Sequence, residues 1–216
     1  MSIIAEAIGK CTRCGHNQQI TIYKSINVSE NPELKAKVKD GSLFVWECSE
    51  CKEKNLAKYQ TLYHDPAAKL MIWLLPEGQQ ENSKLDNANK RLSGLEGYTL
   101  RRVNDIGSLI EKVNIADAGL DDIVMEMCKY VTKIEMGSKS EDNSNAAKLF
   151  SSTFRFYKLE DDAIVLSFPS NGEMSSIKIG RNVYEDCQGI LGRNPSIRPD
   201  SGFARIDADW LSDIMR

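Results

Sequence analysis

The sequence predicts an α+β protein in two parts, and three observations support this fold class. Two CxxC pairs lie near the N-terminus among strand-like segments, two apolar-faced helical segments follow in the middle, and short strand-like segments separated by turn formers lie near the C-terminus. We expect a zinc-ribbon-like domain with an inserted helix and a following strand and helix pair over residues 1–136, a linker over 137–147, and a small antiparallel α+β lobe over 148–216. A chain of 216 residues is long enough for a sizeable core in this arrangement.

The two CxxC pairs are the strongest chemical signal. They are Cys11 and Cys14, followed by Gly15, and then Cys48 and Cys51. Four thiolates in two such pairs can close a tetrahedral metal site, and zinc is the usual occupant. Gly15 permits the backbone geometry that a tight metal-binding turn needs. The sequence therefore predicts one zinc ion held by these four cysteines.

The 33 residues between the inner cysteines are more than a compact ribbon requires, so they need an element of their own. Residues 18–28 and 43–47 are rich in β-branched and aromatic residues, which predicts strands. Between them, Asn31 can cap a short helix, Pro32 suits its first position, and Gly41 can end it in a left-handed conformation. We expect one helix inserted between two strand-borne cysteine turns.

Here the chain resembles the CpXC domain family, a metal-binding bacterial domain without an assigned activity. The resemblance covers residues 8–135, and besides the cysteines it includes the blocks Ser25-Ile26-Asn27-Val28, Pro32-Glu33-Leu34, Asp40-Gly41-Ser42-Leu43, Leu62-Tyr63-His64-Asp65 and Ala118-Gly119-Leu120-Asp121-Asp122. The family is named for a proline after the first cysteine, whereas Thr12 and Ser49 stand there in this chain. Proline supplies rigidity and no ligand, so the resemblance still implies metal binding.

Two other chemistries are open to CxxC pairs. A thioredoxin-like redox pair needs a helix N-terminus at its reactive thiolate, and neither pair here precedes an amphipathic helix. A catalytic zinc keeps one coordination position for water, whereas four cysteine ligands leave none. Both arguments favour a structural zinc site.

The chain has two histidines, which limits any acid–base chemistry. His16 follows the first cysteine pair, and we expect it to be exposed or to contact a metal ligand. His64 and Asp65 precede Pro66, so Asp65 is expected to cap a turn with His64 hydrogen-bonded nearby. The alternative is a functional His64–Asp65 pair, although no serine nucleophile motif, phosphate-binding glycine loop or dinucleotide fingerprint accompanies it.

The middle of the chain predicts a buried strand over residues 69–76, a polar loop over 77–98, a further strand over 98–103 and then two helices. Gly119 ends the first helix and Gly137 the second. The second helix is expected to bury one apolar face, formed by Ile123, Val124, Met127, Val131 and Ile134. Cys128 and Cys187 lack CxxC partners, so we expect both to be small buried core residues.

The C-terminal part predicts a three-stranded meander and two helices. Its strands are expected over residues 153–158, 163–168 and 174–179, with turns at the acidic run 160–162 and at Asn171-Gly172. A helix is expected over 184–191, and Asp207 can cap a final one. An antiparallel sheet of this size needs a helix on one face to hide its apolar side.

The balance of basic and acidic residues limits the classes of partner that this chain can bind. Lys and Arg number 28 against 31 Asp and Glu, and residues 1–70 carry 10 basic and 8 acidic side chains, so no part has the positive field of a general nucleic-acid binder. No signal-peptide or membrane-spanning stretch is present, which predicts a cytoplasmic protein without a membrane partner. We expect a non-enzymatic, zinc-stabilised interaction or adaptor protein whose partner is another protein; the sequence specifies no oligomeric state.

Two further function classes stay open at this point. A nucleic-acid-associated accessory protein would use a patch formed by Lys10, Arg13, Lys52, Lys54 and Tyr59. A thiol-based redox protein would use a thiolate released from zinc.

Overall fold

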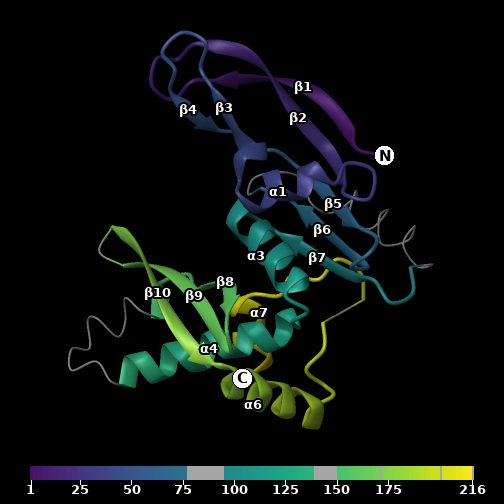
Figure 1. Ribbon diagram of the computed structural model, residues 1–216, viewed down its shortest axis with the longest axis vertical. Coiled ribbons are helices and arrows are strands. Elements are labelled where there is room, and N and C mark those ends of the chain that lie inside the picture. The colour runs from purple at the N-terminus through teal and green to yellow at the C-terminus, as the bar shows by residue number, and fades with distance from the viewer. Residues whose placement is uncertain (77–94, 139–149, 171, 200, 216) are drawn as a thin grey trace. The chain divides into compact units, whose positions relative to one another are not determined.

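The computed structural model describes residues 1–76, 95–138, 150–170, 172–199 and 201–215. The chain divides into two compact units, each with its own strands (Figure 1). Unit 1 consists of Met1–Ile110 and Ser201–Arg205, and unit 2 consists of Glu111–Asp200 and Ile206–Arg216. Both helices and sheets are present among the described residues, which confirms the α+β class. None of the described helices combines the length and the apolar character needed to cross a membrane.

Unit 1 is built on a five-stranded mixed sheet in the order β1-β2-β5-β6-β7. Two of its pairs, β2 with β5 and β6 with β7, are parallel, and the other two are antiparallel. The strands are β1 (Ile3–Lys10), β2 (Asn17–Asn27), β5 (Thr61–Asp65), β6 (Leu70–Leu74) and β7 (Thr99–Val103). β6 is buried along its whole length, as its unbroken apolar sequence predicts for a strand covered on both faces.

The segment between β2 and β5 carries the inserted helix and a small hairpin. Helix α1 (Glu33–Lys39) ends before Gly41, which takes the left-handed conformation with φ of 77°. Pro32 occupies the N-cap of α1, and the expected Asn31 side-chain cap does not form, because the Asn31 amide donates to the Glu33 side chain instead. The turn η1 (Ser42–Phe44) then leads into the two-stranded sheet of β3 (Val45–Glu47) and β4 (Lys54–Leu56).

A segment from near the C-terminus completes unit 1. The Arg102 N–H donates to the Ala204 carbonyl at 2.9 Å, beside a parallel bridge between Arg101 and Ala204 at β7. The Phe203 ring packs edge-on against Trp73 at 5.5 Å, in a cluster of buried residues that includes Met71 and Leu75. One face of the sheet is therefore covered by residues distant in sequence.

Unit 2 packs helices on a three-stranded antiparallel meander in the order β10-β9-β8. Its elements are helix α4 (Asp122–Ser138), strands β8 (Arg155–Glu160), β9 (Ala163–Ser170) and β10 (Glu173–Gly180), and helices α6 (Arg181–Arg193) and α7 (Ala208–Ile214); helix α3 (Ile106–Asp117) begins in unit 1 and ends in unit 2. Asp207 caps α7 as expected, since its side chain accepts a hydrogen bond from the Trp210 N–H. The buried core joins residues of α4, the three strands, α6 and α7.

Helix α4 buries Ile123, Val124 and Met127 as expected, but its buried surface does not follow the whole expected face. Met125 and Cys128 are fully buried in the unit 2 core, and the Thr132 hydroxyl donates to the Cys128 carbonyl at 2.7 Å. Val131 and Ile134, which the apolar periodicity placed inside, are exposed. The expectation for these two residues is therefore wrong, and the expectation that Cys128 and Cys187 are buried is confirmed. The reason is that the helix also buries charged side chains, which hydropathy assigns to the surface.

These buried charges form ion pairs between α3 and α4. The Lys129 ammonium lies 3.0 Å from a Glu111 carboxylate oxygen and 2.6 Å from Glu126. The same Glu111 oxygen accepts the Phe156 N–H at 2.8 Å, which ties the cluster to β8. A separate pair joins Lys112 to Asp122 at 2.7 Å. Each of these side chains is buried, so every charge depends on its partner for stabilisation.

The two units of the structure do not divide at residues 137–147, where the sequence predicts a linker. Helix α4 belongs to unit 2, together with the strands that follow it, whereas it was expected in the N-terminal domain over residues 1–136. The expected linker falls largely outside the described residues, and so does most of the expected loop over 77–98. The proposed linker therefore stays a prediction.

Candidate metal centre

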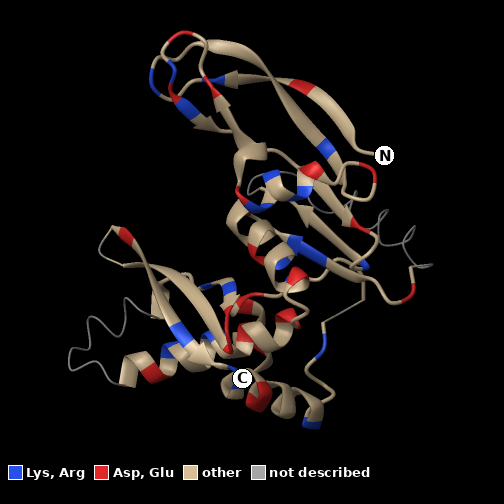
Figure 2. Cartoon of the chain, viewed as in Figure 1, with Lys and Arg blue, Asp and Glu red and all other residues tan. Residues whose placement is uncertain are grey.

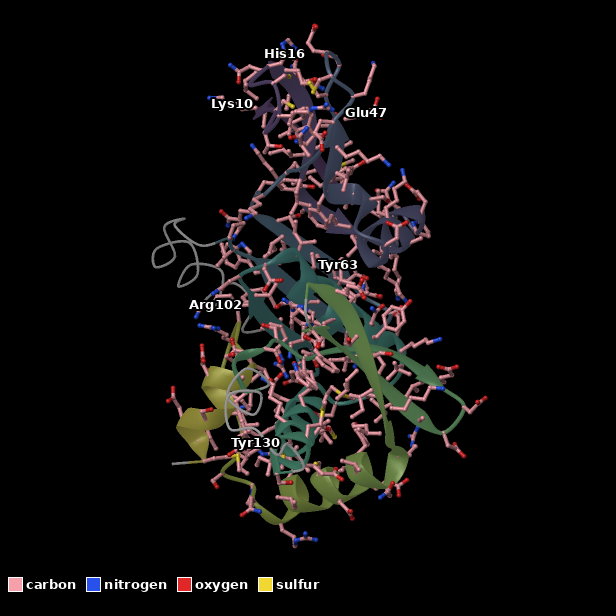
Figure 3. The ribbon with its side chains drawn as sticks, turned by 90° about the vertical axis from the view of Figure 1, so that its left-hand side faces the viewer. Lys10, His16, Glu47, Tyr63, Arg102 and Tyr130 are labelled. Carbon is pink, nitrogen blue, oxygen red and sulfur yellow. The ribbon has the colours of Figure 1, made fainter. Side chains whose placement is uncertain are left out.

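The four cysteines of the two CxxC pairs meet in unit 1, although 33 residues separate the inner two. Their sulfur atoms all lie within 4.8 Å of one another, and the Cys11–Cys51 and Cys14–Cys48 sulfurs are 3.5 and 3.6 Å apart. Cys11 and Cys48 are buried, whereas Cys14 is exposed. Figure 3 shows sulfur atoms in the region where Lys10, His16 and Glu47 are labelled.

Each pair lies on a tight turn between two antiparallel strands, β1–β2 for the first pair and β3–β4 for the second. The two turns share the same backbone hydrogen bonds. Gly15 N–H donates to the Cys11 carbonyl and Lys52 N–H to the Cys48 carbonyl, both at 3.0 Å. Gly15 and Lys52 both adopt positive φ, 74° and 59°, so Lys52 accepts the backbone strain that Gly15 avoids. The chain thus builds two equivalent turns that present their sulfurs to a common point.

Backbone amides and neighbouring thiols set the acidity of the cluster. The Cys14 and Arg13 amides, which point at the Cys11 sulfur, lower the pKa of that thiol to about 6. The His16 amide has the same effect on Cys14. The neighbouring thiols Cys51, Cys48 and Cys11, together with partial desolvation of the sulfur, outweigh it and raise the pKa of Cys14 to about 12. Four clustered thiols resist complete deprotonation unless a cation joins them. The cluster therefore favours a divalent metal.

Asn55 of β4 ties the first turn to the second hairpin. Its side-chain carbonyl accepts hydrogen bonds from the Thr12 N–H at 2.8 Å and the Thr12 hydroxyl at 2.9 Å. Its amide nitrogen donates to the Cys11 sulfur at 3.6 Å and to the Glu53 carbonyl at 2.9 Å. Thr12 stands where the resemblance expects proline, which could donate neither of these two hydrogen bonds. In this chain the two hydrogen bonds to Asn55 fix the turn instead of a proline ring.

Gln18 of β2 makes the reciprocal connection. Its side-chain amide donates to the Glu47 carbonyl at 3.1 Å, and its side-chain carbonyl accepts the Ser49 N–H at 2.7 Å. Sequence reasoning missed both Asn55 and Gln18. Asn55 offered one weak signal, because asparagine is disfavoured in strands. Its burial, which the structure shows, explains why it needs hydrogen-bond partners.

The donor set fits a tetrahedral metal ion. A Zn–S distance of about 2.3 Å places the sulfurs of a regular tetrahedron about 3.8 Å apart, so the observed separations of 3.5 and 3.6 Å need only a small expansion. They are far longer than the roughly 2.0 Å of a disulfide bond. The four cysteines are therefore placed to hold a metal ion, as their spacing predicts.

The other candidate site residues are placed as follows. His16 adjoins the metal centre, and its backbone carbonyl accepts the Cys11 N–H at 2.8 Å. Asp65 is buried, accepts the Ala68 N–H at 3.1 Å and pairs with Lys35 at 2.9 Å, so it caps the turn before β6. The His64 ring lies 3.4 Å from the Tyr98 hydroxyl. Partial burial of this ring lowers the pKa of His64. Consecutive strand residues point to opposite faces, so His64 and Asp65 do not converge on one site.

The structure also bears on the redox interpretation of the cysteines. Strands rather than helices follow both pairs, so neither pair gains the helix N-terminus that activates a thioredoxin-like thiolate. Cys128 and Cys187 lie in the core of unit 2, outside the four-cysteine cluster.

Replacing Asn55 with alanine should weaken metal binding about 10- to 100-fold, because it removes the Thr12 hydrogen bonds and the amide donor to the Cys11 sulfur. Competition with a chromophoric chelator measures this change. Gln19→Ala is the control, since Gln19 is exposed on β2, next to Gln18 in the sequence. Equal affinities for the two variants would show that Asn55 does not organise the centre.

Comparison with known proteins identifies a family. A family model described as "CpXC protein" matches residues 10–129, more than half of the chain. This confirms the family resemblance, which the sequence placed at residues 8–135. Neither the curated proteins nor the solved structures give a match to this chain.

Proposed function

The chain belongs to the CpXC family, and from this premise we propose that Cys11, Cys14, Cys48 and Cys51 hold one structural zinc ion in a non-enzymatic interaction or adaptor protein. The observation that carries the proposal is the closed four-thiol geometry, with all sulfurs within 4.8 Å of one another. Thiolates are soft ligands that select zinc from the common divalent ions, and four of them complete its tetrahedron. Such a site offers no open position for substrate or activated water.

A structural zinc here would fix the β3–β4 hairpin against the β1–β2 hairpin, because each contributes one cysteine pair. The fixed hairpin carries an exposed apolar pair. Val45 and Leu56 are directly opposite in the register and are 44% and 52% exposed. Exposed apolar side chains on a rigid hairpin suit contact with another protein. This surface supports the adaptor proposal and names the residues to test.

Two residues of the expected nucleic-acid-binding patch are not available as that alternative requires. Tyr59 is buried against Phe44 at 5.5 Å between ring centroids, so it offers no face for stacking on a base. Arg13 pairs with Glu53 at 3.6 Å. Figure 2 shows acidic and basic positions interspersed along the hairpins of unit 1 rather than a continuous basic stretch. These observations favour a protein partner over nucleic acid.

Metal substitution tests the zinc proposal. The purified protein should contain about one equivalent of zinc, and the cobalt-substituted form should show the visible absorption of a tetrahedral ion together with sulfur-to-cobalt charge transfer. A well-folded protein that binds no zinc or cobalt, or a cobalt spectrum of an octahedral oxygen site, would overturn it.

Affinity capture with the full chain tests the adaptor role. Wild-type protein, the Val45→Glu/Leu56→Glu variant and the unit 2 control Met174→Glu, at a residue that is also exposed, should each be used as bait. We expect a specific protein partner that the control retains and the hairpin variant loses, with zinc content unchanged in all three. Equal capture by the hairpin variant, or enrichment of nucleic acid in place of protein, would contradict the proposed surface.

A further inference from the structure

Strand β1 is an edge strand of the unit 1 sheet, and it exposes several isoleucine side chains to solvent. Within the described residues β1 pairs only with β2, so its other edge is unpaired (Figure 1). Ile3, Ile4 and Ile8 are 52%, 59% and 72% exposed. Natural edge strands are protected by proline, bulges or several charges, because an open apolar edge invites another strand. β1 has no proline, and its charges are Glu6 and Lys10 alone. A register shift against β2 lies between Ile3 and Ile4, at the N-terminal end of the strand, and the register is regular from Ile4 to Lys10.

The hydrogen-bond pattern identifies which backbone groups face the open edge. In an antiparallel pair, residues alternate between those bonded to the neighbouring strand and those directed away from it. The Cys11 N–H is bonded to the His16 carbonyl, immediately beyond the Lys10–Asn17 pair. The odd residues of β1 therefore face β2, and the even residues, Ile4, Glu6, Ile8 and Lys10, direct their N–H and C=O groups outward.

The same even residues share one face of the strand, where charge and apolarity are arranged in a self-complementary way. Two antiparallel copies of β1 related by a two-fold axis keep this face continuous, so even residues pair with even residues. A register that centres Ile8 on the axis places Glu6 opposite Lys10 of the second copy, twice. A register shifted toward the N-terminus instead opposes Glu6 to Glu6 or pairs charges with isoleucines, and both are unfavourable.

We propose that the β1 edge is a homodimerisation surface, where two copies of this chain pair antiparallel with Ile8 against Ile8 and Glu6 against Lys10. The even residues then form hydrogen-bonded pairs, which extends the sheet of unit 1 through a second molecule. On the other face Ala7 meets Gly9, over which the Trp46 ring of the same chain packs. The proposal is independent of the role of the metal centre.

Charge reversal tests both the dimer and its register. Sedimentation of the metal-loaded full chain, from micromolar to millimolar concentrations, should show a reversible dimer. Glu6→Lys and Lys10→Glu should each raise the dissociation constant roughly 10- to 30-fold, because each turns two attractive pairs into repulsive ones. The double variant Glu6→Lys/Lys10→Glu should recover the wild-type dissociation constant.

Two controls separate dimer loss from misfolding. The thermal midpoint, measured at a concentration where the wild type is monomeric, should be unchanged in every variant, since both side chains are exposed. Zinc content should also be unchanged, and it is measured because Lys10 adjoins the Cys11 ligand. Met174→Lys, at the edge strand of unit 2, should leave the dissociation constant unchanged. A monomer at all concentrations would overturn the proposal, and so would a dimer that resists both single reversals or is not rescued by the double one.

Discussion

Cys48→Ser protein is expected to lose its metal and to unfold locally at the two cysteine turns, while unit 2 keeps its structure. Cys48 is fully buried and its sulfur lies 3.6 Å from that of Cys14, so serine removes both a ligand and a packed side chain. Structural zinc contributes on the order of 10 kcal/mol to the folding of small domains, far more than the short β3–β4 hairpin gains from its own contacts. Hydrogen exchange by mass spectrometry should show fast exchange across 9–19 and 44–57 and unchanged protection in β8–β10.

The control for this experiment is Cys187→Ser, which also removes a buried cysteine but from the core of unit 2. That variant should keep one metal equivalent and lose protection only in unit 2. Treating wild-type protein with a strong chelator should reproduce the Cys48→Ser pattern. If the Cys48→Ser protein kept native exchange rates around both turns, the metal would not be what holds the hairpins together.

The elements closest to the metal centre were the most predictable, because their signals are local. Two CxxC pairs, glycine at position 15 and β-rich flanks are enough to predict sulfurs converging from two strand turns. Gly41 and Asp207 likewise mark helix ends through local backbone chemistry, and both act as expected. Other local signals were less exact, since the Asn31 side chain does not cap α1 and Gly137 lies within α4 instead of after its end.

The supports of the site were not predictable, because they depend on pairing between distant segments. Asn55 reaches Thr12 and Gln18 reaches Ser49 only after the two hairpins have met. Strand β1 was missed for a related reason: its alternation of isoleucine with alanine and glycine is weak, and its inward face consists of small residues. Nothing local indicates that residues 201–205 return to cover unit 1.

In helix α4, buried charged side chains make hydropathy a poor guide to which residues are buried. Its sequence predicts one apolar stripe and a solvated polar face, yet Glu126 and Lys129 on that polar side are buried. The charges form ion pairs within α4 and between α3 and α4, which makes their burial tolerable. Val131 and Ile134, near the C-terminal end of α4, are exposed, whereas Val124 and Met127 of the same expected face are buried. Periodicity alone cannot distinguish such a face from a solvated one.

Lys129→Met is expected to destabilise the protein by about 3–5 kcal/mol near neutral pH, because it removes the shared cation of two buried carboxylates. Lys129 lies 3.0 Å from Glu111 and 2.6 Å from Glu126, and methionine fills similar space without a charge. Lys158→Met is the matched control, since Lys158 pairs with Glu160 at 3.4 Å on the surface and should cost about 1 kcal/mol or less. Chemical denaturation of both variants measures the difference.

The pH dependence of the Lys129→Met variant identifies the cause of its instability. Burial already raises the pKa of Glu126 above its unfolded value, although Lys129 opposes this shift. The folded state therefore binds more protons than the unfolded state between the two pKa values, and stability falls as pH rises through that window. Removing Lys129 raises the folded pKa of Glu126 further and widens the window, so the loss of stability should shrink as the pH is lowered from about 8 toward about 5.

Adding Glu126→Gln to Lys129→Met should recover part of the lost stability, because it neutralises one of the two buried carboxylates that Lys129 contacts. Glu111, the other carboxylate, still has Arg155 at 4.0 Å. It should also flatten the pH dependence, since Glu126 no longer takes up a proton in the folded state. Glu111 keeps its hydrogen bond from the Phe156 N–H in every variant, which keeps β8 attached to the cluster. A pH-independent deficit that the second substitution left unchanged would mean that Lys129 stabilises unit 2 by packing rather than by charge.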